Sequence, residues 1–270
     1  MADAENLIET LSLEPIEVNL FRGRAPQSQG PRIFGGLVIG QALLAAYQTV
    51  QGRLCHSLHC YFIRPGDPSV PILYDVDRAR DGRSFTTRRV TAIQKGEQIF
   101  NLAASFQDDE PGAEHQDEMP NVPGPDELSE DPRDRDWRRP IEIRAVDGKF
   151  GSQVKGPAVQ DIWMRATAPL GDDPVLNQCV IAYASDMSFL STSMRPQGWG
   201  WQTPGLQSAS LDHAVWFHRP SLFNQWHLYA QRSPSASGSR GMNLGFIYNQ
   251  DGRLVATTAQ EGLIRLRPRA

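Results

Sequence analysis

The sequence predicts an α+β protein in which one folding unit, a helix followed by antiparallel strands, occurs twice. Two segments carry the same marks in the same order, an Arg-Pro pair and then a turn glycine. The first has Arg64 and Gly96, 32 positions apart, and the second has Arg219 and Gly252, 33 positions apart. Marks at a nearly shared spacing indicate a repeated unit. A helix followed by an antiparallel meander is an α+β arrangement.

The first unit is predicted to hold one long buried helix. A short helix and a strand are expected within Leu7–Phe21. Gly35–Tyr47 is apolar and Ala-rich around Gln41, and a helix that is apolar on most sides is a buried one. Turn sequences such as Asp81-Gly82 separate β-prone segments. The predicted strands are Leu58–Ile63, Pro71–Arg80, Ser84–Ala92 and Gln98–Gln107.

A change of composition separates the two units. From Asp108 to Pro140 the chain is acidic and rich in proline. Such a segment is expected to bury no core and to be partly ordered at best. We therefore expect an N-terminal domain over residues 1–115, a linker over residues 116–140, and a C-terminal domain over residues 141–270 that carries the reactive side chains.

The second unit is predicted to repeat the helix and the strands. Its long helix is expected over Asp173–Leu190, with Asp173 as N-cap and Pro174 at the first helical position. Apolar residues in this segment keep the helical period. The predicted strands are Ile141–Val146, Asp161–Ala166, Ala209–Phe217, Trp226–Arg232, Gly241–Tyr248 and Arg253–Ile264.

Composition and charge exclude several classes of function. A net charge of −4 and a pI of about 5.9 provide no basic surface for nucleic acid, so no nucleic-acid partner is expected. No apolar run approaches the roughly 20 residues of a membrane span, and the N-terminus lacks the features of a signal peptide. The three cysteines fit a reducing compartment, so we expect a cytoplasmic protein.

Asp186, Ser210 and Gln260 are the polar residues that distinguish the second copy from the first. Asp186 lies in an otherwise apolar helical segment, where a carboxylate is costly unless it is hydrogen-bonded or used. Gln260 aligns with Ala104 when the copies are counted from their glycines. Ser210 aligns with Cys55 when they are counted from the Arg-Pro pairs. Duplicated scaffolds often keep their chemistry in one half.

Other patterns of catalytic or ligand-binding residues are weak. Ser210 and His213 are expected on opposite faces of one strand, so Ser210-Leu-Asp-His213 does not predict a local hydrolase triad, and no nucleophile-elbow motif occurs. His59 is a candidate base at a strand. No histidine or carboxylate spacing predicts a metal site, and no glycine-rich segment predicts a nucleotide cofactor. We therefore expect neither metal nor cofactor.

Seven segments, in order along nearly the whole chain, resemble the acyl-CoA thioesterase II family, which is built as a double hotdog. They are Phe21–Gly23, Phe34–Leu43, His56–Gly66, Arg80–Phe85, Tyr183–Asp186, Leu211–Pro220 and Gln260–Arg265. The resemblance implies two long buried helices wrapped by one continuous curved antiparallel sheet. It also implies hydrolysis of acyl-CoA thioesters to free fatty acid and coenzyme A.

The resemblance also implies roles for the three distinguishing residues. The family holds its hydrolytic water with an Asp, a Thr or Ser, and a Gln, and these positions match Asp186, Ser210 and Gln260. Serine at position 210, where the family often has threonine, keeps the hydroxyl. A buried carboxylate is a suitable general base for such a water. Candidate substrate-binding residues are Gln41, for the lining of the site, and Arg83, Arg88 and Arg240, for the phosphates of coenzyme A.

Two alternatives remain open at this point. A hotdog hydratase or dehydratase acting on acyl-CoA would use a base such as His59. A non-catalytic module would bind acyl-CoA without turnover. We expect acyl-CoA as the small-molecule partner, and a homo-oligomer that is a dimer or tetramer of double hotdogs.

Overall fold

The computed structural model describes residues 7–26, 31–128, 140–147, 153 and 155–267. The N-terminal half begins with helix α1 and a short hairpin, where the sequence had predicted a helix and one strand. Its four longer strands lie within a few residues of their predicted positions. The elements are α1 (Leu7–Leu11), β1 (Glu14–Glu17), β2 (Leu20–Gly23), α2 (Gly35–Tyr47), β3 (Leu54–Phe62), β4 (Ile72–Asp81), β5 (Phe85–Gln94) and β6 (Glu97–Gln107).

The C-terminal half follows the same plan, with one predicted strand divided into two. The segment expected as a single strand over Ala209–Phe217 forms β9 and β10, which are separated at Leu211. The elements are η2 (Pro125–Glu127), β7 (Ile141–Ala145), β8 (Val159–Ala166), α3 (Pro174–Ser185), α4 (Ser191–Met194), η3 (Arg195–Gln197), β9 (Leu206–Ser210), β10 (Asp212–Phe217), β11 (His227–Ser237), β12 (Arg240–Asn249) and β13 (Leu254–Leu266).

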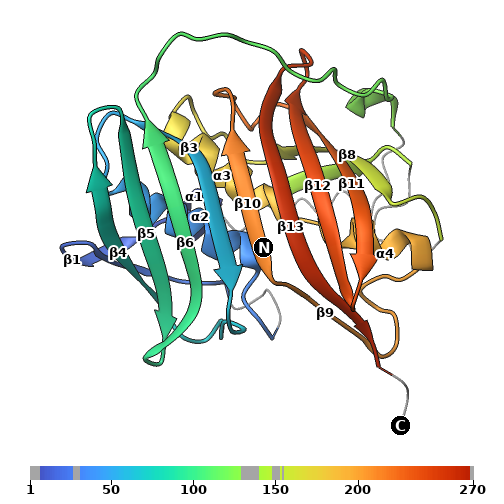
Figure 1. Ribbon diagram of the computed structural model, residues 1–270, viewed down its shortest axis with the longest axis horizontal. Helices are drawn as coiled ribbons and strands as arrows, with labels where there is room; N and C mark the ends of the chain where they lie inside the picture. Colours follow the sequence, from blue (N-terminus) through green and yellow to red (C-terminus); the bar gives the residue numbers. More distant parts are fainter. Residues whose placement is uncertain (1–6, 27–30, 129–139, 148–152, 154, 268–270) are drawn as a thin grey trace.

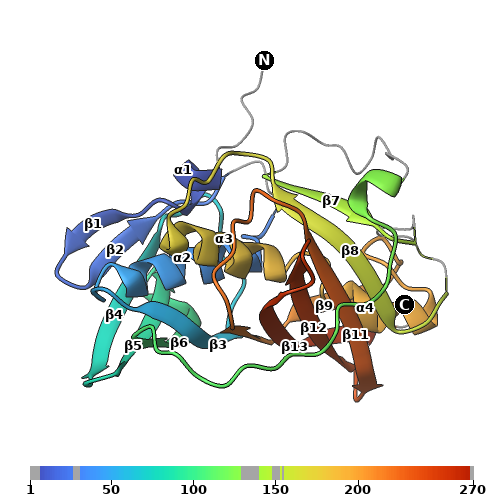
Figure 2. The same ribbon diagram turned by 90° about the horizontal axis from the view of Figure 1, so that it is seen from above.

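All described strands belong to one antiparallel sheet that spans both halves. The order is β1-β2-β4-β5-β6-β3-β10-β13-β12-β11-β8-β7, with β9 paired to β13. The two halves meet where β3 pairs with β10, and Leu58 opposes the equally buried Val215 at this seam. This pairing confirms the expectation of one continuous sheet. Figure 2 shows the sheet curving around α2 and α3, which lie side by side on its concave face.

The same strand order is read outward from the seam in both directions. On one side it is β3, β6, β5, β4 and β2, and on the other it is β10, β13, β12, β11 and β8. In each half, the central helix comes earlier in the sequence than the four strands that lie nearest to the seam. The repeat seen in the sequence therefore corresponds to two equivalent structural units.

The two central helices are buried but shorter than predicted. α2 has 13 residues and α3 has 12, close to the average of about 11–12 for globular proteins, so they are not long helices. α3 begins as predicted, because the Asp173 side chain accepts from the Val175 N–H at 2.9 Å and Pro174 follows. It ends at Ser185, five residues before the predicted end. Ser188 adopts a left-handed φ of 62°, which breaks the helical path.

Glycines allow α2 and α3 to cross closely in antiparallel directions. A Cβ at Gly36 would lie 2.2 Å from the backbone oxygen of Tyr183, and one at Gly40 would lie 3.1 Å from the backbone oxygen of Cys179. A side chain at Gly36 would push the helices apart, and one at Gly40 would crowd the same crossing. The N-terminus of α2 therefore lies against the C-terminus of α3.

The acidic segment after β6 is more closely packed than its composition predicts. Met119, Val122 and Leu128 pack against a cluster of buried residues on the outer side of the second half. The indole N–H of Trp163 donates to the backbone oxygen of Pro123 at 2.9 Å. The prediction that this segment buries no core is therefore wrong for residues 116–128. Residues 129–139 of the expected linker lie outside the described residues.

We predict that residues 1–115 expressed alone aggregate or self-associate. The isolated fragment would expose the full edge of β3 that β10 covers in the intact chain, and an unpaired, apolar strand edge is a template for association. Size-exclusion chromatography with light scattering measures the outcome. A stable, soluble monomer of this fragment would contradict the prediction.

Candidate active site

Asp186 lies where the two central helices meet. It is the C-cap of α3, and the backbone N–H of Gly36 in the first turn of α2 donates to its carboxylate. A Cβ at Gly35 would lie 2.7 Å from Asp186 Oδ2 and 2.9 Å from the Phe62 ring, so only glycine fits there. Asp186 thus follows α3, whereas the sequence had placed it inside the helix.

The surroundings of Asp186 favour a carboxylate that binds and releases a proton. Burial raises its pKa above the usual value for aspartate. Hydrogen bonds from Gln260, the Gly36 N–H and Ser210 oppose that rise. The positive end of the α2 dipole also lowers the pKa, because it stabilises the ionised carboxylate. The carboxylate is therefore ionisable in a largely dehydrated position, which suits a general base.

Gln260 and Ser210 reach Asp186 from the sheet. Gln260 Nε2, on β13, donates to Asp186 Oδ1 at 2.6 Å. Ser210 Oγ, at the end of β9, donates to the same oxygen at 3.4 Å, which is longer than the usual hydroxyl bond of about 2.5–3.0 Å. The structure thus brings together the three residues singled out in the sequence.

A bulge between β9 and β10 turns Ser210 and His213 to the same side. Ser210 pairs with Gly262 on β13, whereas Ala214 pairs with Ala259. The register changes by one residue, so Leu211 and Asp212 together oppose Glu261. The Glu261 N–H donates a hydrogen bond to Asp212 Oδ1 at 2.7 Å. The prediction of opposite faces is wrong because it assumed uninterrupted alternation.

His213 is a member of the site that sequence reasoning missed. It is 1% exposed, and its Nδ1 lies 3.0 Å from Gln260 Nε2. Its Nε2 lies 2.8 Å from Ser185 Oγ. Burial lowers the pKa of His213 to about 3, so the ring is neutral near pH 7. The available signal was its alignment with Leu58, six positions before each Arg-Pro pair.

Two buried oxygens beside this cluster accept no hydrogen bond among the described residues. They are Gln260 Oε1 and Asn243 Oδ1. These residues are opposed in register on β13 and β12, so their side chains are cross-strand neighbours. A buried acceptor without a donor is costly. The pair therefore marks a position suited to a water molecule or another donor.

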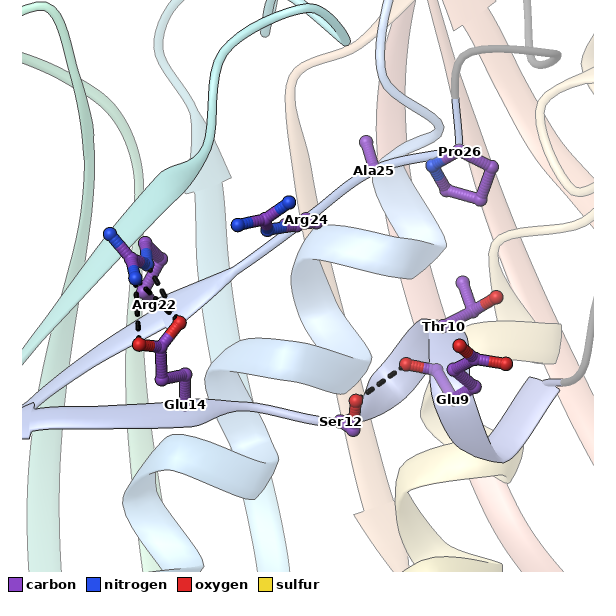
Figure 3. A pocket seen from close by; sticks show the side chains of 8 residues that line it. All are labelled: Glu9, Thr10, Ser12, Glu14, Arg22, Arg24, Ala25 and Pro26. Carbon is purple, nitrogen blue, oxygen red and sulfur yellow. Dashed lines mark hydrogen bonds and ion pairs between the residues drawn. The ribbon is translucent and has the colours of Figure 1, made fainter.

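Gln41 is not placed with the Asp186 cluster. Its Nε2 donates to the backbone oxygens of Thr10 at 2.7 Å and Arg24 at 3.0 Å, and its Oε1 accepts from Tyr74 at 2.8 Å. It thereby ties α1 and β2 to α2. Thr10 and Arg24 also line a hollow of about 510 Å³ on the N-terminal half, where the charges of Arg22 and Glu14 are paired (Figure 3).

The three candidate arginines have different environments. Arg88 is fully buried in the N-terminal half, where its guanidinium donates to Thr49, Asp81 and backbone oxygens. These internal hydrogen bonds stabilise the N-terminal half, and they leave Arg88 no donor for an external phosphate. Arg83 and Arg240 are exposed, and Arg240 Nε donates to Glu261 Oε1 at 2.8 Å.

His59 lies on the other side of the sheet from Asp186. It is exposed on β3 between the buried residues Leu58 and Cys60, so its side chain points away from the concave face. Its ring packs edge-on against Trp216, with centroids 5.1 Å apart. A site centred on His59 would therefore lie on the face of the sheet opposite to the Asp186 carboxylate.

The equivalent position in the first half is filled by a structural network. Cys55 and Ala104 replace Ser210 and Gln260 there, and both are buried. The Tyr47 hydroxyl donates to Gln178 Oε1 and accepts from the Cys55 N–H at 2.7 Å, while Gln178 Nε2 donates to the Cys55 oxygen at 3.0 Å. The polar cluster with a carboxylate is thus confined to one end of the helix pair.

Comparison with known proteins gives consistent matches over nearly the whole chain. The acyl-CoA thioesterase family model matches residues 132–263, and the acyl-CoA thioesterase N-terminal domain model matches residues 24–107. Acyl-CoA thioesterase 2 of Haemophilus influenzae is 40% identical over 96% of this chain and 97% of its own length.

Solved structures agree with these matches. An acyl-CoA thioesterase II from Mycobacterium marinum is 42% identical, covers 97% of this chain and 98% of its own, and superposes with a TM-score of 0.83. A hotdog-fold protein from Alicyclobacillus acidocaldarius, at 22% identity, covers 96% of this chain and 98% of its own with a TM-score of 0.80. The fold is therefore a hotdog fold, and the chain belongs to the acyl-CoA thioesterase II family.

Proposed function

We propose that this protein hydrolyses acyl-CoA thioesters to free fatty acid and coenzyme A, with Asp186, Ser210 and Gln260 activating the water. The observation that carries the residue assignment is the contact of Gln260 and Ser210 with one oxygen of the Asp186 carboxylate. Family membership supports the reaction class, because relatives that match nearly the full chain are acyl-CoA thioesterases.

The reaction proceeds by direct attack of water on the thioester carbonyl. Asp186 accepts one proton from the water as the water oxygen bonds to the carbonyl carbon. The C–S bond then breaks, and the leaving coenzyme A thiolate takes up the proton held by Asp186, which regenerates the carboxylate. Ser210 and the free oxygen of Gln260 orient the water. The mechanism uses no metal, no cofactor and no covalent intermediate.

The oxyanion formed during attack is stabilised from the start of α2. In the first turn of that helix the Gly36 N–H donates to Asp186 and the Leu37 N–H donates to the Phe34 oxygen at 3.2 Å, so the Gly35 N–H is the candidate donor to the oxyanion. Backbone N–H groups and the helix dipole are effective donors to a developing negative charge. Because Gly35 has no side chain, the Asp186 carboxylate and the Phe62 ring pack directly against the start of α2.

The two rival activities are less well supported. A hydratase with His59 as base would need a substrate site on the outer face of the sheet, because His59 is exposed there. A non-catalytic binding module does not account for a carboxylate buried at some energetic cost beside a free acceptor. Release of free thiol from acyl-CoA separates thioesterase activity from both rivals.

The organisation of the chain is also part of the proposal. We propose a double hotdog with domains over residues 1–115 and 141–270 joined by residues 116–140, and a homo-oligomer of such chains. The N-terminal family model over residues 24–107 supports the first boundary.

The three cysteines are free thiols, which supports a cytoplasmic location. Arg83 and Arg240 remain candidates for contacts with the phosphates of coenzyme A. In the described residues, no helix is long and apolar enough to cross a membrane.

We predict that Asp186→Asn lowers kcat for thioester hydrolysis about 10²–10⁴-fold, the usual effect of losing a general base. Thiol release from acyl-CoA, together with a melting curve, measures the outcome. Asp173→Asn, at the other end of α3, is the matched control and keeps kcat because asparagine is also a good N-cap. Wild-type turnover in Asp186→Asn would remove Asp186 from the mechanism.

The pH dependence of activity and stability is predicted from the raised pKa of Asp186. Only the ionised form is a base, so kcat/KM falls with decreasing pH at a point above the ordinary aspartate pKa of about 3.9.

For stability, the raised pKa of Asp186 in the folded protein gives a stabilising contribution that is present below the unfolded pKa and lost as pH rises through the folded pKa. Asp186→Asn is therefore expected to melt at or above the wild-type temperature near pH 7, with a smaller difference at low pH, where the wild-type carboxyl is also neutral. The reverse order at pH 7 would contradict the assigned environment.

Ser210→Ala and Gln260→Ala are each predicted to lower kcat more than they change KM. The double variant is expected to be little worse than the poorer single one, since both side chains act on one water. Cys55→Ser, at the first-half counterpart of Ser210, serves as the control with nearly unchanged turnover. Steady-state kinetics measures all four. Fully multiplicative losses would mean that the two side chains act independently.

A further inference from the structure

His213 takes part in a chain of hydrogen bonds whose direction is fixed by a backbone carbonyl. Ser185 Oγ donates to the Ala182 oxygen at 2.9 Å, and that oxygen can only accept. The Ser185 proton is therefore used, so Ser185 Oγ accepts from His213 Nε2 at 2.8 Å. A neutral imidazole carries one N–H, which leaves His213 Nδ1 as an acceptor.

The bare Nδ1 of His213 determines which way the Gln260 amide points. It lies 3.0 Å from the amide atom that also lies 2.6 Å from Asp186 Oδ1. Both neighbours are acceptors when Asp186 is ionised, so the shared atom is the NH₂ group, with one N–H to each. The carbonyl Oε1 is then directed elsewhere, and it is the buried oxygen without a donor among the described residues.

His213 and Gln260 occur as a matched pair in the repeat. They lie one step beyond the Ala214–Ala259 pair of β10 and β13. The equivalent cross-strand pair of the first half is Leu58 and Ala104, on β3 and β6. Both members are polar in one half and apolar in the other, which is expected if they act as a unit.

We propose that His213 is a positioning residue of the thioesterase site. The neutral His213 ring accepts a hydrogen bond from Gln260 at Nδ1. This bond holds the Gln260 amide with one N–H toward His213 and the other toward Asp186, so that Oε1 faces the reacting water. His213 does not touch the substrate and moves no proton. This inference rests on the proposed function, because it assigns to Gln260 the orientation of the hydrolytic water.

The chain contains a matched control in His227. It is as buried as His213, and its Nε2 also faces a serine, Ser221, at 2.7 Å. Its Nδ1, however, faces the backbone oxygen of Gln225 at 2.9 Å and so carries the proton. His213 and His227 are thus predicted to be opposite tautomers, and His227 makes none of its described hydrogen bonds with the Asp186 cluster.

The first test measures the tautomers in the intact, unmodified protein. The ¹⁵N chemical shifts of labelled histidine rings distinguish a protonated from a bare ring nitrogen. We expect the proton on Nε2 of His213 and on Nδ1 of His227 at neutral pH. A proton on Nδ1 of His213 would overturn the proposal, because that nitrogen could not then accept from Gln260.

The second test substitutes the two ends of the ring separately. His213→Asn places an amide oxygen near Nδ1, whereas His213→Gln places its polar atoms near Nε2 and leaves Nδ1 unreplaced. We expect kcat of the Gln variant to be lower by about tenfold than that of the Asn variant, as for loss of one hydrogen bond. KM is expected to change little in either. The same two changes at His227 affect melting temperature but not the ratio of kcat values.

The third test asks whether His213 acts only through Gln260. His213→Leu, which introduces the residue found at the first-half position, is expected to lower kcat about 10–100-fold for misplacement of a positioning group. In a Gln260→Ala background the same change is expected to have no further effect on kcat. An equal loss in both backgrounds would assign His213 a purely structural role and overturn the proposal.

The outcomes separate this inference from the proposed function. If the wild-type protein releases no thiol from acyl-CoA, the proposed function itself fails. If Gln260→Ala keeps wild-type kcat while thiol is released, the assignment of Gln260 fails and His213 loses its role with it. If both hold and the Asn and Gln variants at position 213 have equal kcat, only the positioning role of His213 is wrong.

Discussion

The close crossing of α2 and α3 is the constraint on which the rest of the structure depends. At Gly36 the backbone of α2 meets that of α3 without room for a side chain, and at Gly40 the contact is tight. This crossing sets the start of one helix against the end of the other, and it therefore places the Gly36 amide beside the Asp186 carboxylate. The sheet can enclose both short helices because β3 and β10 join its two halves.

The same geometry exists at the other end of the helix pair, but its side chains are used differently. There the hydroxyl of Tyr47 and the amide of Gln178 bond to each other and to the backbone of Cys55, so these polar groups are satisfied internally. At the Asp186 end there remain a desolvated carboxylate and the Gln260 oxygen, which accepts no hydrogen bond within the described part of the chain. Unmet polar groups weaken a fold and are typical of sites that bind or react. The duplication thus separates a structural end from the end that holds the proposed active site.

Much of the fold could be predicted from the sequence because strand periodicity, turn glycines and the repeated Arg-Pro marks are local signals. The end of α3 could not, since it depends on a left-handed Ser188 that nothing nearby requires. The relative facing of Ser210 and His213 was mispredicted because a one-residue bulge is set by pairing with a distant strand. Arg88 was assigned a substrate contact that its burial excludes. The orientation and burial of such side chains can be predicted only when the distant strands and groups that they contact are known.

Rapid-quench kinetics with excess enzyme tests the central claim, direct attack by a water that Asp186 activates, most directly. Coenzyme A, free fatty acid and the intact mass of the protein are followed through a single turnover of an acyl-CoA thioester. Coenzyme A and fatty acid are predicted to appear together, and the mass of the protein is predicted to stay unchanged. A burst of coenzyme A ahead of the fatty acid, with an acyl group added to the chain, would contradict it.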